Sequence, residues 1–383
     1  MLKWLSGKFE LSRGGNASNL RPMEGLRGLA ALLVFLAHFV TLMEPWIVRD
    51  VAFFKFATAL HTIGHTGVDL FFVLSGFLIY GSLISKHSDF RVFITRRVAR
   101  IYPAFTVVFV VYVVLSFVYP AENKIPRDNS EALIYLGQNF LLLPGLFPIR
   151  PMISVAWSLS YEMFFYLAIP LVVAIFKMRE RAVLFRMCFF ISVAILFVYY
   201  CSTSGAYQGG HIRLTLFISG ILLYEVMKNS NHIVPSSLFA FSIFNAGILL
   251  STLVPVGAAD GHVLKACVLC ITYFVVLLSC FRNPTGWFSR CFAWTPLRWL
   301  GNMSYSYYLI HGLTLKGLFL FLPKLLPPNY GHGFWIFWML LPLFFIISLL
   351  PATALFVLIE RPFSLNVAGR QSNRRDARNH IDA

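Results

Sequence analysis

Residues 21–39, RPMEGLRGLAALLVFLAHF, decide the fold of this chain. A charged, glycine-containing entry leads directly into an apolar helix that carries one histidine, His38. Arg27 lies 11 residues before His38, which on an α-helix is about 16 Å of rise and places both side chains on nearly the same face. One helix face is therefore predicted to carry a cation near the membrane surface and a titratable group deep in the bilayer.

Ionisable side chains inside membrane helices are costly and usually mark a pathway or a reactive site. His38 is therefore a candidate catalytic base, although a helix-packing histidine hydrogen-bonded to a neighbour is the alternative. For Arg27, a role as a positively charged anchor on the cytoplasmic side is as good an interpretation as a role in binding.

The composition is that of a polytopic membrane protein. The sequence is 58% hydrophobic and only 13% charged, and apolar runs of membrane-spanning length recur along it. We expect an all-α fold of about ten transmembrane helices, of ~20 residues each. The expected spans are residues 23–44, 60–85, 101–119, 154–176, 185–201, 211–227, 234–254, 263–281, 303–323 and 334–359.

The net charge of +16 resides in short loops between spans, which indicates topology rather than nucleic-acid binding. The positive-inside rule then places both termini in the cytoplasm. We expect a cytoplasmic N-terminal segment (1–21), a transmembrane domain (22–363) and a basic cytoplasmic tail (364–383). The first helix is expected to be retained, because no signal-peptide pattern precedes it. The apolar piece 132–143 is too short to span and is expected to be re-entrant or interfacial.

No metal site or bound cofactor is expected. Cys267 and Cys270 form a CxxC pair, but no second pair or histidine cluster lies near them in the sequence. We interpret the six cysteines as small residues of the membrane core.

The second span brings Asp69 and Ser75 into an apolar run. Counted from the span ends, Asp69 and His38 lie at depths that agree to within about one helical turn. An aspartate beside an imidazole fixes its tautomer and stabilises its protonated form. The alternative is that Asp69 pairs with a basic residue for packing. Ser75 is a candidate substrate contact.

The fourth span places Trp157 and Glu162 at a comparable depth. Glu162 is a second candidate catalytic carboxylate. Trp157 is either an interface aromatic or a stacking platform for a sugar ring.

A basic cluster stands at the cytoplasmic start of the third span. Arg97 and Arg100 are one turn apart and can hold phosphates as a pair of guanidinium groups, with Arg96 beside them. Alone, such a cluster is more often a topology signal.

The ninth span carries Tyr305 and His311, each either a packing residue or a substrate contact. Glu360 ends the tenth span and is expected to pair with an arginine of the inner side. Other histidines, including His61, His65 and His262, lie at span ends, where solvation is a sufficient interpretation.

These motifs together resemble the acyltransferase-3 family of membrane acyltransferases. The resemblance rests on EGLRGLAALLVFLAH, GVDLFFVLSGFLI, RRVARIYP, WSLSYEMFFY, NMSYSYYLIHG and IERPF, in this order and spacing. It covers residues from about Arg21 to Phe363. Members often have an aspartate where this chain has Glu24, a change that keeps the charge.

The resemblance implies a donor, an acceptor and roles for residues. It implies acyl-CoA from the cytoplasm, acetyl-CoA above all, and the hydroxyl of a glycan such as exopolysaccharide, lipopolysaccharide or a lipid-linked sugar. One family pattern, an arginine or lysine followed by ten intervening residues and then a histidine, falls on Arg27 and His38. A second pattern, RxxR, falls on Arg97 and Arg100. It also implies a bacterial inner membrane and polysaccharide-assembly proteins as partners. Some members carry a further soluble esterase-like domain, which these residues do not contain.

Our hypothesis is that His38 takes the proton of the acceptor hydroxyl as that oxygen attacks the thioester. Asp69 or Glu162 would orient the ring, and the arginine cluster would hold CoA. An acyl-histidine intermediate is also compatible with the sequence. The competing interpretations are a transporter with a proton relay through His38, Asp69 and Glu162, and a non-catalytic subunit of a polysaccharide synthase.

Overall fold

The protein is built from helices. The computed structural model describes residues 2–10, 17–47, 51–85, 89–204, 210–230, 232–254, 259–328 and 333–365. Within these ranges the only extended pairing is an isolated bridge between Pro144 and Phe147, so the predicted all-α fold is confirmed. Most of the predicted basic tail, from residue 366 on, lies outside the described residues.

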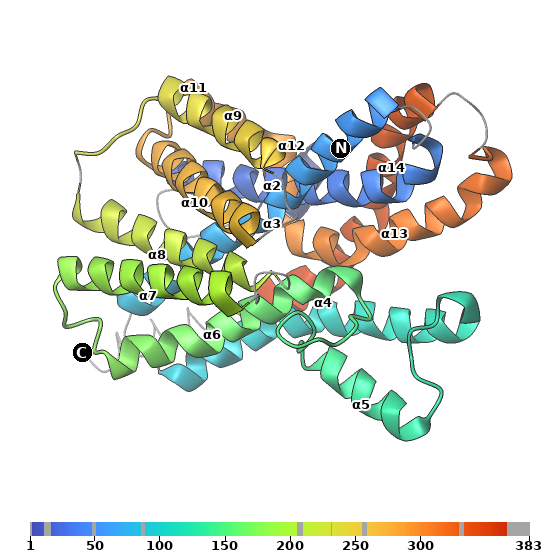
Figure 1. The fold of residues 1–383 in the computed structure, drawn as a ribbon, viewed down its shortest axis with the longest axis horizontal. Helices are drawn as coiled ribbons and strands as arrows, with labels where there is room; N and C mark the ends of the chain where they lie inside the picture. The colour runs from blue at the N-terminus through green and yellow to red at the C-terminus, as the bar shows by residue number, and fades with distance from the viewer. Residues whose placement is uncertain are drawn as a thin grey trace. The chain divides into compact units, whose positions relative to one another are not determined.

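The chain forms two compact units, and Figure 1 labels helices of both. The first comprises Met1–Lys86, Leu171–Ser304 and Leu315–Ile346, and the second His87–Pro170, Tyr305–Thr314 and Ile347–Ala383. Two long helices, α13 (Ser304–Leu325) and α14 (Gly333–Leu355), contribute residues to both units.

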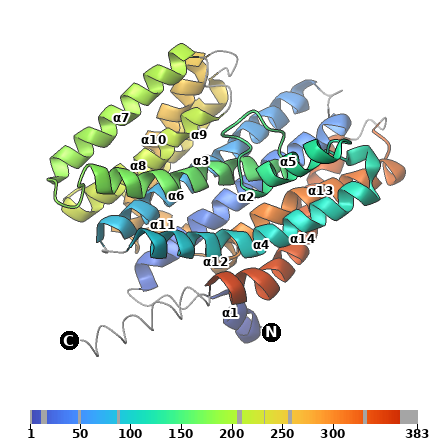
Figure 2. The same cartoon turned by 90° about the horizontal axis from the view of Figure 1, so that it is seen from below.

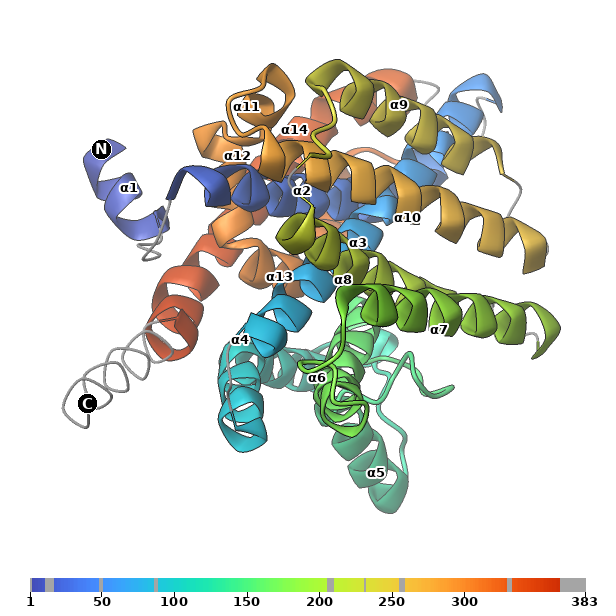
Figure 3. The same ribbon diagram turned by 90° about the vertical axis from the view of Figure 1, so that its left-hand side faces the viewer.

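Helix α2 is the centre of the first unit. It packs along α3 and α12, and α3 packs along α8. Helix α10 lies beside α9 and α8 (Figures 2 and 3). The elements of this unit are α1 (Leu2–Phe9), α2 (Ala17–Ile47), α3 (Val51–Ser85), α7 (Val183–Ser204), the short helix η4 (His211–Arg213), α8 (Leu214–Asn229), α9 (Ser237–Leu253), α10 (Ala259–Arg282), α11 (Trp287–Phe292) and α12 (Thr295–Asn302).

Glycines allow these helices to approach closely. A Cβ atom on Gly64 of α3 would lie 2.6 Å from the backbone nitrogen of Ala37 on α2, and one on Gly67 would collide with the carbonyl of Ala30. Between α3 and α8, Gly76 and Gly220 play the same part. Small residues are the usual means of bringing membrane helices into backbone contact, because lipid supplies no hydrophobic driving force.

The second unit is organised around α4, which packs against η5, the π-helical end of the described chain. Its elements are α4 (Phe90–Val118), η1 (Pro120–Glu122), α5 (Asn129–Phe140), η2 (Ser154–Ala156), the greater part of α6 (Trp157–Ile175) and η5 (Phe356–Leu365). The apolar piece 132–143 lies largely in the helix α5, and whether this helix is re-entrant or interfacial stays a prediction. Helix α5 begins after Asp128, whose carboxylate accepts hydrogen bonds from the amides of Ser130 and Glu131.

Among the described residues, seven helices are long and apolar enough to cross a bilayer: Arg21–Ile47, Val51–Ser85, Phe90–Val118, Ser154–Ile175, Val183–Thr203, Gly261–Arg282 and Gly333–Leu365. The expected spans 211–227, 234–254 and 303–323 are the helices α8, α9 and α13, which do not have this combination of length and apolarity. A multi-pass membrane protein is therefore supported, whereas the count of ten and the side of the termini stay predictions.

Candidate functional site

In the first unit, three histidines gather where α2 meets α3. His38 directly follows Ala37, whose backbone touches Gly64. On α3, His61 and His65 lie one turn apart with their Nε2 atoms at 3.2 Å. His38 lies within electrostatic range of both of these rings. The close approach of the two helices therefore sets the predicted base beside two further imidazoles.

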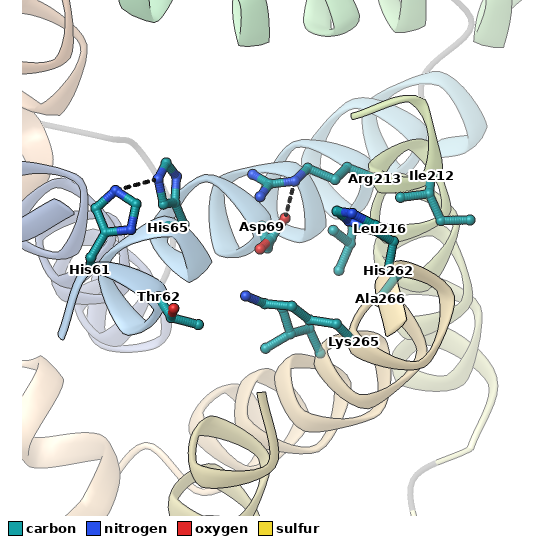
Figure 4. A pocket seen from close by; sticks show the side chains of 11 residues that line it. His61, Thr62, His65, Asp69, Ile212, Arg213, Leu216, His262, Lys265 and Ala266 are labelled. Carbon is teal, nitrogen blue, oxygen red and sulfur yellow. Dashed lines mark hydrogen bonds and ion pairs between the residues drawn. The ribbon is translucent and has the colours of Figure 1, made fainter. Parts of the chain in front are cut away.

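The same face of α3 lines a cavity of about 210 Å³. His61, His65 and Asp69 follow one another at four-residue spacing, which aligns them along one helix face. Figure 4 shows α10 and the start of α8 completing the wall. The lining residues are His61, Thr62, His65, Asp69, Ile212, Arg213, Leu216, His262, Lys265, Ala266 and Leu269.

Asp69 is the buried charge of this cavity. Its side chain forms an ion pair with Arg213, with 3.4 Å between Oδ1 and Nε, and the residue is only 2% exposed. Lys265 extends from α10 into the same space (Figure 4). One carboxylate therefore faces two cations.

Buried hydrogen bonds hold the cavity walls in place. The Tyr273 hydroxyl on α10 donates to the carbonyl of Thr66 on α3, at 3.0 Å. The Ser219 hydroxyl on α8 donates to the carbonyl of Cys270, also at 3.0 Å. Because these bonds join the three helices that carry the lining residues, they fix the cavity's shape.

For Asp69, the alternative of pairing with a basic residue is confirmed, and its predicted action on His38 stays a prediction. Sequence reasoning did not connect Arg213, Lys265 and the histidines of α3, which are half-buried in the wall of this cavity. The spacing of the α3 histidines and Asp69 was the available signal. Ser75, farther along α3, is half-buried.

Arg27 is half-buried, and its Nη2 donates to the hydroxyl of Ser304 at 3.2 Å. Glu24, three residues before Arg27, is buried and forms an ion pair with Arg298. The distance from Oε2 of Glu24 to Nε of Arg298 is 3.0 Å. The negative charge of Glu24 thus has a structural partner, Arg298, on α12.

The arginine cluster belongs to the second unit. Arg100 forms an ion pair with Glu360, which is fully buried and also accepts from the backbone amide and hydroxyl of Ser306. The expected pairing of Glu360 with an arginine is confirmed, and its place on the inner side of the membrane stays a prediction. Arg100 therefore has a structural partner in addition to its predicted contact with CoA.

Arg97 has aromatic neighbours. Its guanidinium lies 5.2 Å from the ring centroid of Phe93 and 5.4 Å from that of Tyr166. The Tyr166 hydroxyl in turn donates to Glu162, so the predicted carboxylate and the predicted phosphate-binding arginine share one tyrosine. Arg96 has a buried Nε with no hydrogen-bond partner among the described residues.

The other predicted contact residues of this unit are packed among helices. Tyr305 donates to the carbonyl of Ile101 at 2.7 Å. His311 is fully buried, and its Nδ1 lies about 3 Å from the carbonyls of Tyr307 and Tyr308, so Nδ1 carries the proton. Trp157 is half-buried and lies edge-on to Tyr161. Their contact with substrate stays a prediction.

Residues 22–360 match a family described as an acyltransferase domain. The chain belongs to the acyltransferase-3 family. This match includes residues of both units, from the first part of the His38 helix to Glu360.

The relatives of this acyltransferase-3 protein include larger bacterial proteins named as O-acetyltransferases. It is 27% identical over 322 residues to the O-acetyltransferase OatA of Staphylococcus aureus, covering 76% of this chain and 50% of that one. It is 26% identical over 323 residues to the peptidoglycan O-acetyltransferase OatA of Listeria monocytogenes, covering 76% and 48%. The protein YrhL of Bacillus subtilis is 28% identical over 318 residues, covering 76% and 47%.

The chain thus spans about half the length of the curated relatives it matches. No solved structure matches it.

Proposed function

We propose that this protein is a membrane O-acetyltransferase that moves an acetyl group from acetyl-CoA to a hydroxyl of a glycan. The observation that carries the proposal is the family match over residues 22–360, within which His38 stands at the contact of α2 with α3. The relatives named as O-acetyltransferases support the acetyl group. A glycan of the cell envelope is the acceptor class that their names suggest.

In this mechanism, His38 accepts the proton of the acceptor hydroxyl. The freed oxygen attacks the thioester carbonyl carbon, the carbon–sulfur bond breaks, and CoA leaves as a thiolate that takes up a proton. A positioned base of this kind contributes typically 10²–10⁴-fold to the rate. A two-step route through an acetyl-His38 intermediate has the same overall balance. Asp69 and Glu162 are the proposed carboxylates that tune the site.

The proposed CoA contacts are Arg27, Arg96, Arg97 and Arg100. A guanidinium group presents donors that match phosphate oxygens. Arg97, which lies over two aromatic rings, and Arg96, which has a buried donor to spare, are the strongest candidates. Arg100 is proposed to position this cluster through Glu360. Trp157, Tyr305, His311 and Ser75 are the proposed contacts with the remaining parts of donor and acceptor.

We also propose that the protein lies in a bacterial inner membrane with both termini in the cytoplasm, where acyl-CoA is made. No resident cofactor is required for this reaction. Polysaccharide-assembly proteins are proposed partners.

A transporter is the second candidate, because His61, His65 and Asp69 form a line of titratable groups along one face of α3. Such lines serve as proton relays in transporters. The arginine cluster has no specific purpose in that function. A transporter also consumes no thioester.

The test is release of free CoA thiol from acetyl-CoA by the purified protein in detergent, with membrane glycan extract as acceptor. The expected result is acceptor-dependent release by the wild type and none by His38→Ala. No release with any extract, together with undetectable CoA binding, would support the transporter.

A further inference from the structure

The cavity of the first unit contains more positive than negative charge. Arg213 and Lys265 face the single carboxylate of Asp69. Within the described part of the chain, the ammonium group of Lys265 makes no hydrogen bond or ion pair. Lys265 shares the carboxylate of Asp69 with Arg213 and has no hydrogen bond of its own, and an ammonium group only partly compensated in this way is costly to bury, so the cavity is suited to a ligand that brings a negative charge.

The carboxylate of Asp69 favours a ligand that also carries a hydrogen-bond donor. Its Oδ1 is buried and has no hydrogen-bond partner among the described residues, since the Arg213 contact at 3.4 Å is an ion pair without hydrogen-bond geometry. An unsatisfied buried acceptor is rare and costs free energy. A hydroxyl group of a ligand in the cavity would satisfy it, whereas a bare anion would be repelled.

The size of the cavity fits one small polar ring. Its volume of about 210 Å³ equals roughly seven waters at ~30 Å³ each. The wall also carries His65, which lies within electrostatic range of Arg213, Lys265 and His38. A ligand held at one end by the cations would therefore lie beside the histidines at the other.

We propose that this cavity binds an acidic sugar unit of the acceptor glycan. The sugar's carboxylate or phosphate accepts from Lys265 and Arg213, and one of its hydroxyls donates to Asp69. A further hydroxyl of the same ring lies next to the histidines His38, His61 and His65. This inference rests on the proposed function and narrows its acceptor class to anionic glycans.

The experiment measures binding and requires no turnover. Methyl glucuronide and methyl glucoside differ only in the carboxylate at C6, so their affinities for the full-length protein in detergent isolate the charge. We expect the acidic sugar to bind at least about tenfold more tightly. Lys265→Gln should abolish the difference and Lys265→Arg should keep it. Lys55→Gln, an exposed lysine of the same α3, is the matched control and should change nothing.

Equal affinity for the two sugars, or a preference that survives Lys265→Gln in protein with a wild-type melting temperature, would overturn the proposal. The anion could instead come from CoA. If adenosine 3′,5′-bisphosphate displaces the glucuronide and its own binding is lost in Lys265→Gln, the cavity is a donor site and the proposal is wrong. Because binding is measured without acetyl transfer, a failure of the proposed function would leave these results intact.

Discussion

Replacing Gly64 with alanine should push α3 away from α2 at the level of His38. The added Cβ would lie 2.6 Å from two backbone atoms of α2, the amide nitrogen of Ala37 and the carbonyl oxygen of Leu33. Ordinary contact begins at 3.4 Å, so the helices must separate by about 0.8 Å. Neither atom can move by a side-chain rotation. Because His38 follows Ala37 directly, its ring shifts relative to His61 and His65.

A misplacement of about 1 Å at a reacting group can cost ~100-fold in rate, and we expect a loss of that order in acetyl transfer. The assay is CoA release at saturating acetyl-CoA, with thermal unfolding measured in parallel. The control is Gly317→Ala, also within a helix, where an added Cβ meets nothing within 4 Å. That variant should keep full activity and gain slight stability from helix propensity. If Gly64→Ala retained wild-type rate and melting temperature, the tight α2–α3 contact would have no part in the site.

The remaining predictions concern the second unit. Glu360→Leu removes the anionic partner of Arg100 and should destabilise the protein by about 3–5 kcal/mol, whereas the double variant Arg100→Met/Glu360→Leu should cost much less than Arg100→Met and Glu360→Leu together; additive costs in thermal unfolding would contradict the pairing. Arg97→Ala should raise the KM for acetyl-CoA about tenfold or more, with Arg97→Lys intermediate; an unchanged KM would remove Arg97 from the CoA site. Hydrogen bonds from the Ser130 hydroxyl and two backbone amides hold the pKa of Asp128 below its model-compound value of 3.8, so they stabilise the start of α5 above that pH and are lost as pH falls through the lowered pKa. The protection factors of the α5 amides, which correct exchange rates for their intrinsic pH dependence, should fall over that acidic range and be low at every pH in Asp128→Ala; protection that does not change with pH in the wild type would exclude the cap.

Helix content and the Glu360 pairing could be predicted from the sequence because both depend on local pattern. Apolar runs of spanning length give the helices directly. Glu360 ends an apolar run on the side where arginines are concentrated, and a buried carboxylate there requires a cationic partner. The identity of that partner, Arg100, depends on how α4 packs against η5, which no local pattern records.

The cavity could not be predicted because it also depends on how distant helices pack together. Arg213 and Lys265 come from elements far along the chain from Asp69, and each looks like an ordinary charge near a span end. Only the packing of α8 and α10 on α3 brings them together. That packing depends on glycines such as Gly76 and Gly220, whose role is visible only when the opposing backbone is known.

Of the three expected spans that are not both long and apolar enough, α8 and α9 are short, with 16 and 17 residues, whereas α13 has 22 residues and falls short in apolarity. Helix α13 was expected to span, but it carries several polar side chains, among them Tyr305, Ser306 and His311. Tyr305 donates to the carbonyl of Ile101 on α4 and Ser306 donates to Glu360 on η5, whereas His311 bonds to carbonyls of α13 itself. Polar residues at such positions lower the hydropathy on which span prediction depends.

The most direct test of the central claim is acetyl transfer from radiolabelled acetyl-CoA to glycan by the purified protein, comparing the wild type with His38→Gln. Glutamine keeps the size and polarity of the side chain but cannot act as a base. His232→Gln, at an exposed histidine, is the matched control. The account predicts a loss of about 10²–10⁴-fold in His38→Gln alone, with an unchanged melting temperature. Full transfer by His38→Gln would contradict it.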